Sequence, residues 1–226
     1  MMKSFTIQIE TLSPLHLGSG QENIVLDADV VYDQYGMPYF PARRFRGLLY
    51  ESAMEMEEMS QADPIMSHSR LIALFGHQDE TASQLRISNF YLGQPDQPGN
   101  TYEQLCQQWQ YLQAAYPGIF TREDILAEYT DMRYQTAIDF DSGTALEGSL
   151  HNMRVVREGT TFYGTVEMES ENPDDELIFL LALKNLCHAG AKRNRGLGRI
   201  RCSIIGQEQG HMQKLWEKIR ERGTIV

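Results

Sequence analysis

Apolar and polar residues alternate strictly over residues 5–10, where phenylalanine and isoleucine interleave with threonine, glutamine and glutamate. A period of two places alternate side chains on opposite faces of a strand, so one face of this segment is predicted to be buried. Runs rich in β-branched and aromatic residues predict further strands at 23–32, 85–92, 161–168 and 199–205.

Other segments carry apolar residues at a helical spacing. Phe45, Leu48, Leu49, Ala53 and Met56 form one stripe, with acidic residues on the remaining positions of the segment 45–59. Comparable patterns, together with a Thr-Arg-Glu-Asp capping sequence that begins at residue 121, predict helices at 102–116, from 121 onward, at 174–189 and at 213–222.

These strands and helices follow one another without strict strand–helix–strand alternation, which favours an α+β protein with an antiparallel sheet. A ferredoxin-like, RRM-like core with insertions fits the order of elements. We therefore predict a single domain over residues 1–226, with insertions around 51–84, 94–130 and 133–160.

Charge changes this picture only when its position is considered. The 226 residues include 31 acids and 20 bases, a net charge of −11 that on average disfavours nucleic acid. However, segments 51–63 and 167–176 hold five and six acids without any base, and together they account for the whole excess. A solvated helix face and a helix N-terminus explain these two runs. The remaining acids balance the bases, which are clustered.

Composition also limits the setting of the protein. The three cysteines, at 106, 187 and 202, have no CxxC spacing, so we expect neither a disulfide framework nor a zinc site. The longest apolar stretch, residues 177–183, is too short to cross a bilayer, and the N-terminus lacks a signal-peptide pattern. We expect a cytoplasmic protein that does not contact membrane.

Residues 188–201 combine glycines and basic residues with no acid, between a predicted helix and a predicted strand. Glycines let backbone amides approach a phosphate closely, and cations neutralise it. The spacing matches neither a P-loop nor the GxGxxG of a dinucleotide fold. Phosphate contact is the favoured interpretation, and a solvated basic turn that closes the helix is the alternative.

Four motifs, in this order along the chain, resemble those of RAMP-superfamily CRISPR-associated proteins. They are residues 15–20 followed by 37–50, residues 74–92, residues 133–162, and the segment that ends in Arg-Gly-Leu-Gly-Arg-Ile at residue 200. The length and order are most similar to Cas7-type backbone subunits of type III effectors, the Csm3 and Cmr4 group. One departure is Ala-Arg-Arg-Phe-Arg-Gly at 42–47, where the family has Gly-Ser-Ser-Leu-Lys-Gly. The added charge favours RNA contact.

This resemblance implies a protein that carries guide RNA on one face, with target RNA lying across it. It also implies a multi-subunit complex that includes Cas10-type and small subunits. Phosphate contacts are then expected from the basic residues and glycines of the motifs, namely Arg43, Arg44, Arg46, Gly190, Lys192, Arg193, Arg195, Gly196, Gly198 and Arg199.

The resemblance further implies a catalytic aspartate before the Pro-Tyr-Phe-Pro motif that cleaves target RNA with a divalent metal, Mg²⁺ or Mn²⁺. Counting back from Asp33 places this residue at Asp27, as both catalytic residue and metal ligand. Asp29 lies two residues further, on the same face of an extended chain. Two close carboxylates can share a hard cation or orient a ribose 2′-hydroxyl toward its own phosphate. From the residues alone, solvent-facing strand positions are the stronger interpretation.

By the same resemblance, residues 133–157 form a thumb, a hairpin that pushes between RNA bases. Met153 or Leu150 is the expected wedge, and Arg133, Arg154 and Arg157 are expected on phosphate. An ordinary β-hairpin with packed apolar residues explains the same pattern.

Two other functions stay open at this stage. The chain fits a non-catalytic RNA-binding scaffold of the Cas5/Csx10 type. It also fits a Cas6-like, metal-independent endoribonuclease that cuts precursor RNA, because His16 and His188 lie in or beside the motifs and histidine titrates near neutrality.

Overall fold

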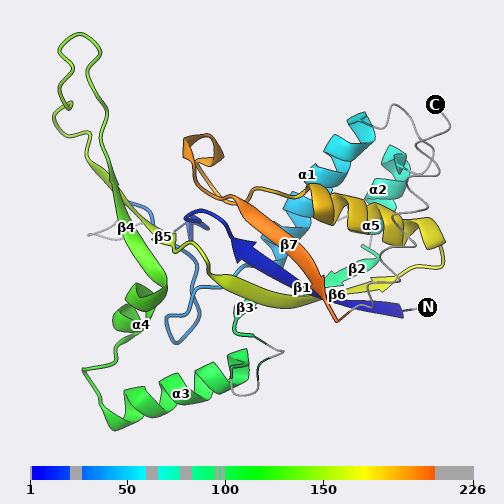
Figure 1. The fold of residues 1–226 in the computed structure, drawn as a ribbon, viewed down its shortest axis with the longest axis horizontal. Helices are drawn as coiled ribbons and strands as arrows, with labels where there is room; N and C mark the ends of the chain where they lie inside the picture. Colours follow the sequence, from blue (N-terminus) through cyan, green and yellow to red (C-terminus); the bar gives the residue numbers. More distant parts are fainter. Residues whose placement is uncertain are drawn as a thin grey trace.

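The computed structural model describes residues 2–20, 27–59, 66–76, 83–94, 97 and 100–206. Its core is an antiparallel sheet in the order β2-β6-β1-β7, with two long helices packed against it (Figure 1). The core elements are β1 (Met2–Thr11), α1 (Ala42–Met59), β2 (Leu85–Ile87), β6 (Thr161–Glu169), α5 (Pro173–Asn185) and β7 (Ile200–Ile205). This βαββαβ order is that of a ferredoxin-like fold, so the predicted fold class is confirmed.

The sheet buries the face that the alternation predicts. The apolar residues of segment 5–9 are at most 1% exposed, and the ring of Phe5 lies 5.2 Å from that of Phe179 on α5. The predicted apolar stripe of α1 faces the same core, and the Ser52 hydroxyl donates a 2.8 Å hydrogen bond to the carbonyl of Ala182. The two core helices are therefore fixed to each other as well as to the sheet.

Additional elements lie between the core strands. They are α2 (His68–Phe75), β3 (Tyr91–Leu92), α3 (Tyr102–Ala115) and α4 (Arg122–Tyr129). α4 begins at the predicted capping box of Thr121 and Asp124. α3 has no fully buried residue. It packs on the body through Tyr102, which stacks on Tyr91 at 4.1 Å, and through partly buried residues as far as Trp109 (Figure 1). α1 runs through residue 59, past the position where the first insertion is predicted to begin.

Three predicted elements differ from the structure or fall outside it. The described part of the predicted strand 23–32 forms single bridges, because its partner changes from Met153, on the strand 151–156, to Gly18 and then to Pro38, so no continuous ladder forms. The predicted strand 85–92 is divided into β2 and β3, which both pair with β6. The predicted helix 213–222 lies outside the described residues.

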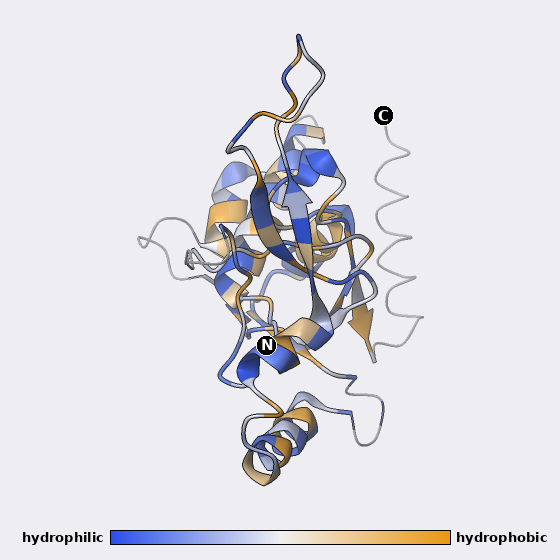
Figure 2. Cartoon of the chain, turned by 90° about the vertical axis from the view of Figure 1, so that its left-hand side faces the viewer, coloured by the Kyte–Doolittle hydropathy of each residue, from blue (hydrophilic) through white to orange (hydrophobic). Residues whose placement is uncertain are grey.

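A two-stranded hairpin projects from the body (Figure 1). It pairs β4 (Thr130–Gln135) with β5 (His151–Val156), and residues 136–150 form a long tip. We call this hairpin the thumb. At its root Met153 and Val155 pack with Leu197 in a small core separate from the main one. Along its tip apolar and polar residues are interspersed (Figure 2). Four apolar side chains there are exposed: Ile138, Phe140, Leu146 and Leu150.

Candidate nucleic-acid interface

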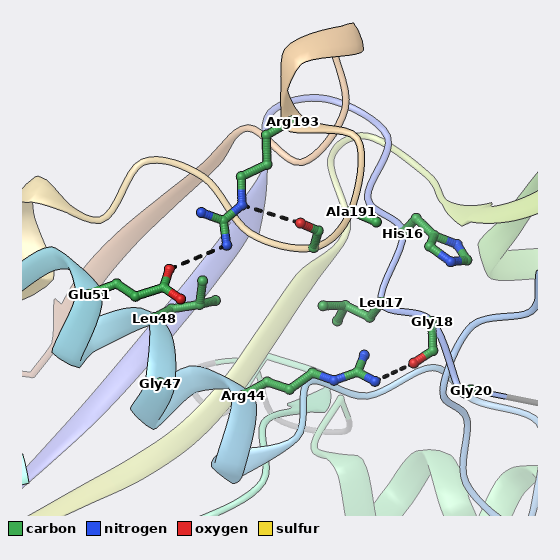
Figure 3. Close-up of a pocket in the computed structure, with 11 residues that line it drawn as sticks. His16, Leu17, Gly18, Gly20, Arg44, Gly47, Leu48, Glu51, Ala191 and Arg193 are labelled. Carbon is green, nitrogen blue, oxygen red and sulfur yellow. Dashed lines mark hydrogen bonds and ion pairs between the residues drawn. The ribbon is translucent and has the colours of Figure 1, made fainter. Parts of the chain in front are cut away.

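A hollow of about 520 Å³ lies where the two halves of the first sequence motif meet the last one (Figure 3). Its walls come from residues 16–20, from the first turns of α1, and from the Gly-rich segment after α5. Two arginines about 150 positions apart in the chain, Arg44 and Arg193, reach it from different walls. A concave surface with converging cations is suited to an anion such as a phosphate.

Contacts within the walls hold both arginines in place. The guanidinium of Arg44 donates to the carbonyl of Gly18. Nε of Arg193 donates to the carbonyl of Gly190 at 3.2 Å, and its Nη2 lies 3.6 Å from a carboxylate oxygen of Glu51 (Figure 3). Both arginine side chains remain exposed, so a ligand can replace or share these contacts. Sequence reasoning missed Glu51, because an exposed helical acid carries no signal of its tertiary neighbour.

The glycines of the loop have a packing role that the sequence interpretation did not include. A Cβ on Gly190 would lie 2.3 Å from the carbonyl oxygen of His16, and one on Gly198 would lie 1.9 Å from that of Ala189. Both glycines also adopt positive φ values, +75° and +77°. Gly190 lets the loop lie directly on the segment after β1, and Gly198 lets the two ends of the loop approach each other. Gly196 also has a positive φ, but among the described residues no atom lies within 4 Å of the position that a Cβ would occupy there.

The remaining cations of the two basic motifs fall into two groups. Arg43, Arg195 and Arg199 are exposed. Lys192 and Arg46 are used within the fold, because the Lys192 ammonium donates to the Gln135 side chain at 2.7 Å and Arg46 donates to the carbonyl of Leu85 at 3.0 Å. The first of these bonds ties the Gly-rich loop to the thumb.

On the thumb, the structure corrects the role expected for Arg154. This residue is 5% exposed, and its guanidinium lies 3.0 Å from a carboxylate oxygen of Asp29 and in contact with Glu123. A buried guanidinium with two carboxylate partners presents no surface to a phosphate.

The other two arginines of the thumb differ from each other. Arg157 donates to the carbonyls of residues 127 and 128 at the end of α4 and to Asp131. Only Arg133 of the three extends from the thumb as an exposed cation without such contacts in the described structure.

The expected wedge residues also differ in exposure. Met153 is 3% exposed in the small core at the thumb root, so it cannot insert between bases. Leu150 is 66% exposed at the tip, as a wedge requires. Phe140, which the sequence interpretation did not single out, is 100% exposed. Its signal is an aromatic residue within the polar turn Asp-Phe-Asp-Ser-Gly.

The two candidate aspartates occupy different environments. The Asp27 side chain is 55% exposed, and one of its oxygens accepts a 2.8 Å hydrogen bond from the backbone of Asn152, with Nδ1 of His151 3.5 Å away. Asp29 is buried against Arg154 and accepts from the backbone of Val30. The expectation that Asp27 and Asp29 share a cation is wrong, because Asp29 is already paired with Arg154.

The residues around Asp27 fit a metal in one limited way. Oδ1 of Asp27 has no partner among the described residues, so it can act as a single carboxylate ligand. No group of three or more histidine, cysteine, aspartate or glutamate side chains gathers anywhere in the described part of the chain. Mg²⁺ is often held by one carboxylate together with phosphate oxygens and water. Asp27 fits that arrangement, and Asp29 does not.

A family model of the RAMP superfamily matches residues 8–201, and the chain belongs to this superfamily. The fold agrees with solved structures. One is a chain of a structure described as the Type III-B Cmr-beta bound to cognate target RNA, with a TM-score of 0.64, 15% identity and coverage of 90% of this chain and 97% of that chain.

A second is from the apo state of Type III-B Cmr-beta, with a TM-score of 0.60, 14% identity and coverage of 90% and 98%. No curated protein sequence matches the chain. Among the described helices, none has the length and apolar character that a membrane span requires.

Proposed function

We propose that the chain is a Cas7-type backbone subunit of a type III CRISPR effector and binds the sugar–phosphate backbone of guide RNA in the hollow. The convergence of Arg44 and Arg193 on one concave surface carries this proposal. Membership of the RAMP superfamily supports it, and so does a fold shared with chains of Type III-B Cmr-beta, one of them described as bound to target RNA.

The charge distribution suggests the path of the RNA. The exposed cations Arg195 and Arg199 stand further along the Gly-rich loop. Lys192 of this loop bonds Gln135 on β4 of the thumb, the strand that carries the exposed Arg133. Apart from Glu51, which borders the hollow, the described acids of the two acidic runs lie in the later turns of α1 and from the end of β6 to the start of α5. RNA following this path reaches the thumb, where Leu150 and Phe140 are exposed to separate bases. Cas10-type and small subunits are the proposed partners in the complex.

We propose in addition that Asp27 cleaves the target strand. The backbone of Asn152 on β5 fixes the Asp27 carboxylate, next to the β4 residues Arg133 and Tyr134 that pair with Met153 and Asn152. There it can orient a ribose 2′-hydroxyl toward the neighbouring phosphate. A bound Mg²⁺ or Mn²⁺ supplies charge stabilisation of that phosphate. Asp29 has no part in this step, because Arg154 neutralises it in the interior.

Binding in the hollow predicts a specific salt dependence. In the double variant Arg44→Ala/Arg193→Ala we expect single-stranded RNA affinity to fall about tenfold at moderate salt. The slope of log K against log salt should become shallower by about 1.4, because each phosphate contact on a single strand contributes about 0.7. Fluorescence anisotropy with a labelled oligoribonucleotide over a salt series measures both quantities.

The matched control removes the same charge outside the hollow. Arg86 and Arg201 are exposed and ion-paired with Glu169 and Glu10, so Arg86→Ala/Arg201→Ala changes net charge equally. We expect this control to keep most of the wild-type slope. Equal slopes in the two double variants would mean that the hollow is not where phosphate binds.

A further inference from the structure

The side chain of His16 is held in one orientation beneath the hollow. The residue is 5% exposed, and its Nδ1 lies 2.8 Å from the carbonyl oxygen of Arg154. A carbonyl can only accept a hydrogen bond, so Nδ1 carries a proton. In the neutral ring Nε2 is then a lone-pair acceptor. This nitrogen has no hydrogen-bond partner among the described residues.

Gly18 leaves space in front of that acceptor. A Cβ at position 18 would lie 2.9 Å from Nε2 of His16, closer than real side-chain contacts allow. Gly18 does not adopt a positive φ, so its backbone conformation does not require glycine. The carbonyl of Gly18 also accepts a hydrogen bond from the guanidinium of Arg44. Figure 3 shows His16 and Arg44 on either side of this glycine. A free acceptor and a cation thus lie on the two sides of Gly18, and all three residues line the hollow.

We infer that Nε2 of His16 accepts a hydrogen bond from the ribose 2′-hydroxyl of a nucleotide whose phosphate contacts Arg44. This inference rests on the proposed function and adds to it a basis for choosing RNA over DNA. Within a sugar–phosphate backbone the phosphates and ring oxygens are acceptors only, and the 2′-hydroxyl is the one hydrogen-bond donor. An acceptor beside a phosphate-binding cation therefore selects ribose and rejects deoxyribose. Gly18 is the second specificity-determining residue, because it keeps Nε2 accessible.

Three oligonucleotide probes of the same sequence separate the effect of the 2′-hydroxyl on affinity from the effect of the sugar pucker. They are single-stranded RNA, the fully 2′-fluoro oligonucleotide, which keeps the RNA sugar pucker without the donor, and DNA. We expect the wild-type full chain at pH 8 to bind RNA about tenfold more tightly than 2′-fluoro RNA, the gain of one well-placed hydrogen bond. The ratio of the two dissociation constants, measured by anisotropy, is the readout.

Two variants remove the acceptor in different ways. His16→Asn places an amide nitrogen where Nδ1 was, so the bond to the Arg154 carbonyl can persist while nothing replaces Nε2. Gly18→Ala leaves the histidine unchanged and crowds Nε2 with a methyl group. In both we expect the RNA to 2′-fluoro ratio to fall to within about twofold of one. If His16→Asn does not fold, as judged by circular dichroism, Gly18→Ala decides alone.

A wild-type ratio near one, or a ratio retained in Gly18→Ala, would overturn this inference, since donors on the bases would then explain any contact to His16. The proposed function would survive that result if Arg44→Ala/Arg193→Ala still loses affinity for every probe. If the wild-type chain binds none of the three probes, both proposals fail.

Discussion

Asp27→Asn should reduce cleavage of a guide-matched target RNA at least about a hundredfold, with target binding unchanged. Asparagine keeps the shape of the side chain and can still accept the backbone hydrogen bond from Asn152, so the contact with β5 remains in place. It removes the negative charge that orients the hydroxyl or binds a metal, and the loss of one such group typically costs two to four orders of magnitude in rate. The assay is gel analysis of a labelled target with the assembled effector in Mg²⁺.

A matched control is available on β4, the strand that pairs with β5. The side chain of Asp131 on β4 is 59% exposed, close to the 55% of Asp27, and Asp131→Asn makes the same chemical change outside the proposed site. The effector with this control variant should cleave the target RNA at the wild-type rate. Cleavage by Asp27→Asn at the wild-type rate would instead favour a non-catalytic RNA-binding scaffold. Cleavage of precursor RNA by the isolated chain in EDTA would favour a Cas6-like endoribonuclease.

The second large effect concerns stability. Arg154→Met should lower the free energy of unfolding by about 3–5 kcal/mol, because it leaves the buried carboxylate of Asp29 without its cation. The double variant Arg154→Met/Asp29→Asn should recover part of that loss, since no buried charge then remains unpaired. Urea denaturation followed by circular dichroism measures all three proteins.

An exposed arginine provides the comparison for this prediction. Arg201 is ion-paired with Glu10 at a solvent-exposed position, so Arg201→Met should cost less than about 1 kcal/mol. If Arg154→Met costs no more than Arg201→Met, the ion pair with Asp29 does not form in the protein. The case for excluding Asp29 from catalysis would then fail.

Much of the fold could be predicted from local pattern. The strict alternation of residues 5–10 and the apolar stripe of α1 each reflect burial of one face against the same core, so both are visible in the sequence. Their order with the later strands and α5 then identifies a ferredoxin-like fold. The break of the predicted strand 85–92 was not visible, because β2 and β3 both pair with β6 and the interruption depends on that pairing.

The candidate site was predictable in part for a related reason. Arg44 and Arg193 stand in basic motifs that the sequence shows directly, but their convergence on one hollow depends on how the Gly-rich loop lies on residues 14–16. Asp27 and Asp29 show where local rules fail. A period of two places both on one face, yet the segment forms only isolated bridges, so one is exposed and the other is buried.

The most direct test of RNA binding in the hollow is a map of where RNA touches the chain. An oligoribonucleotide that carries photoreactive 4-thiouridine is cross-linked to the full chain, and the attached peptides are identified by mass spectrometry. We predict cross-links within residues 16–20, 43–47 and 190–199, which surround the hollow and the exposed cations beside it. Cross-links that avoid all three segments and concentrate on β2 and β6 would contradict the account.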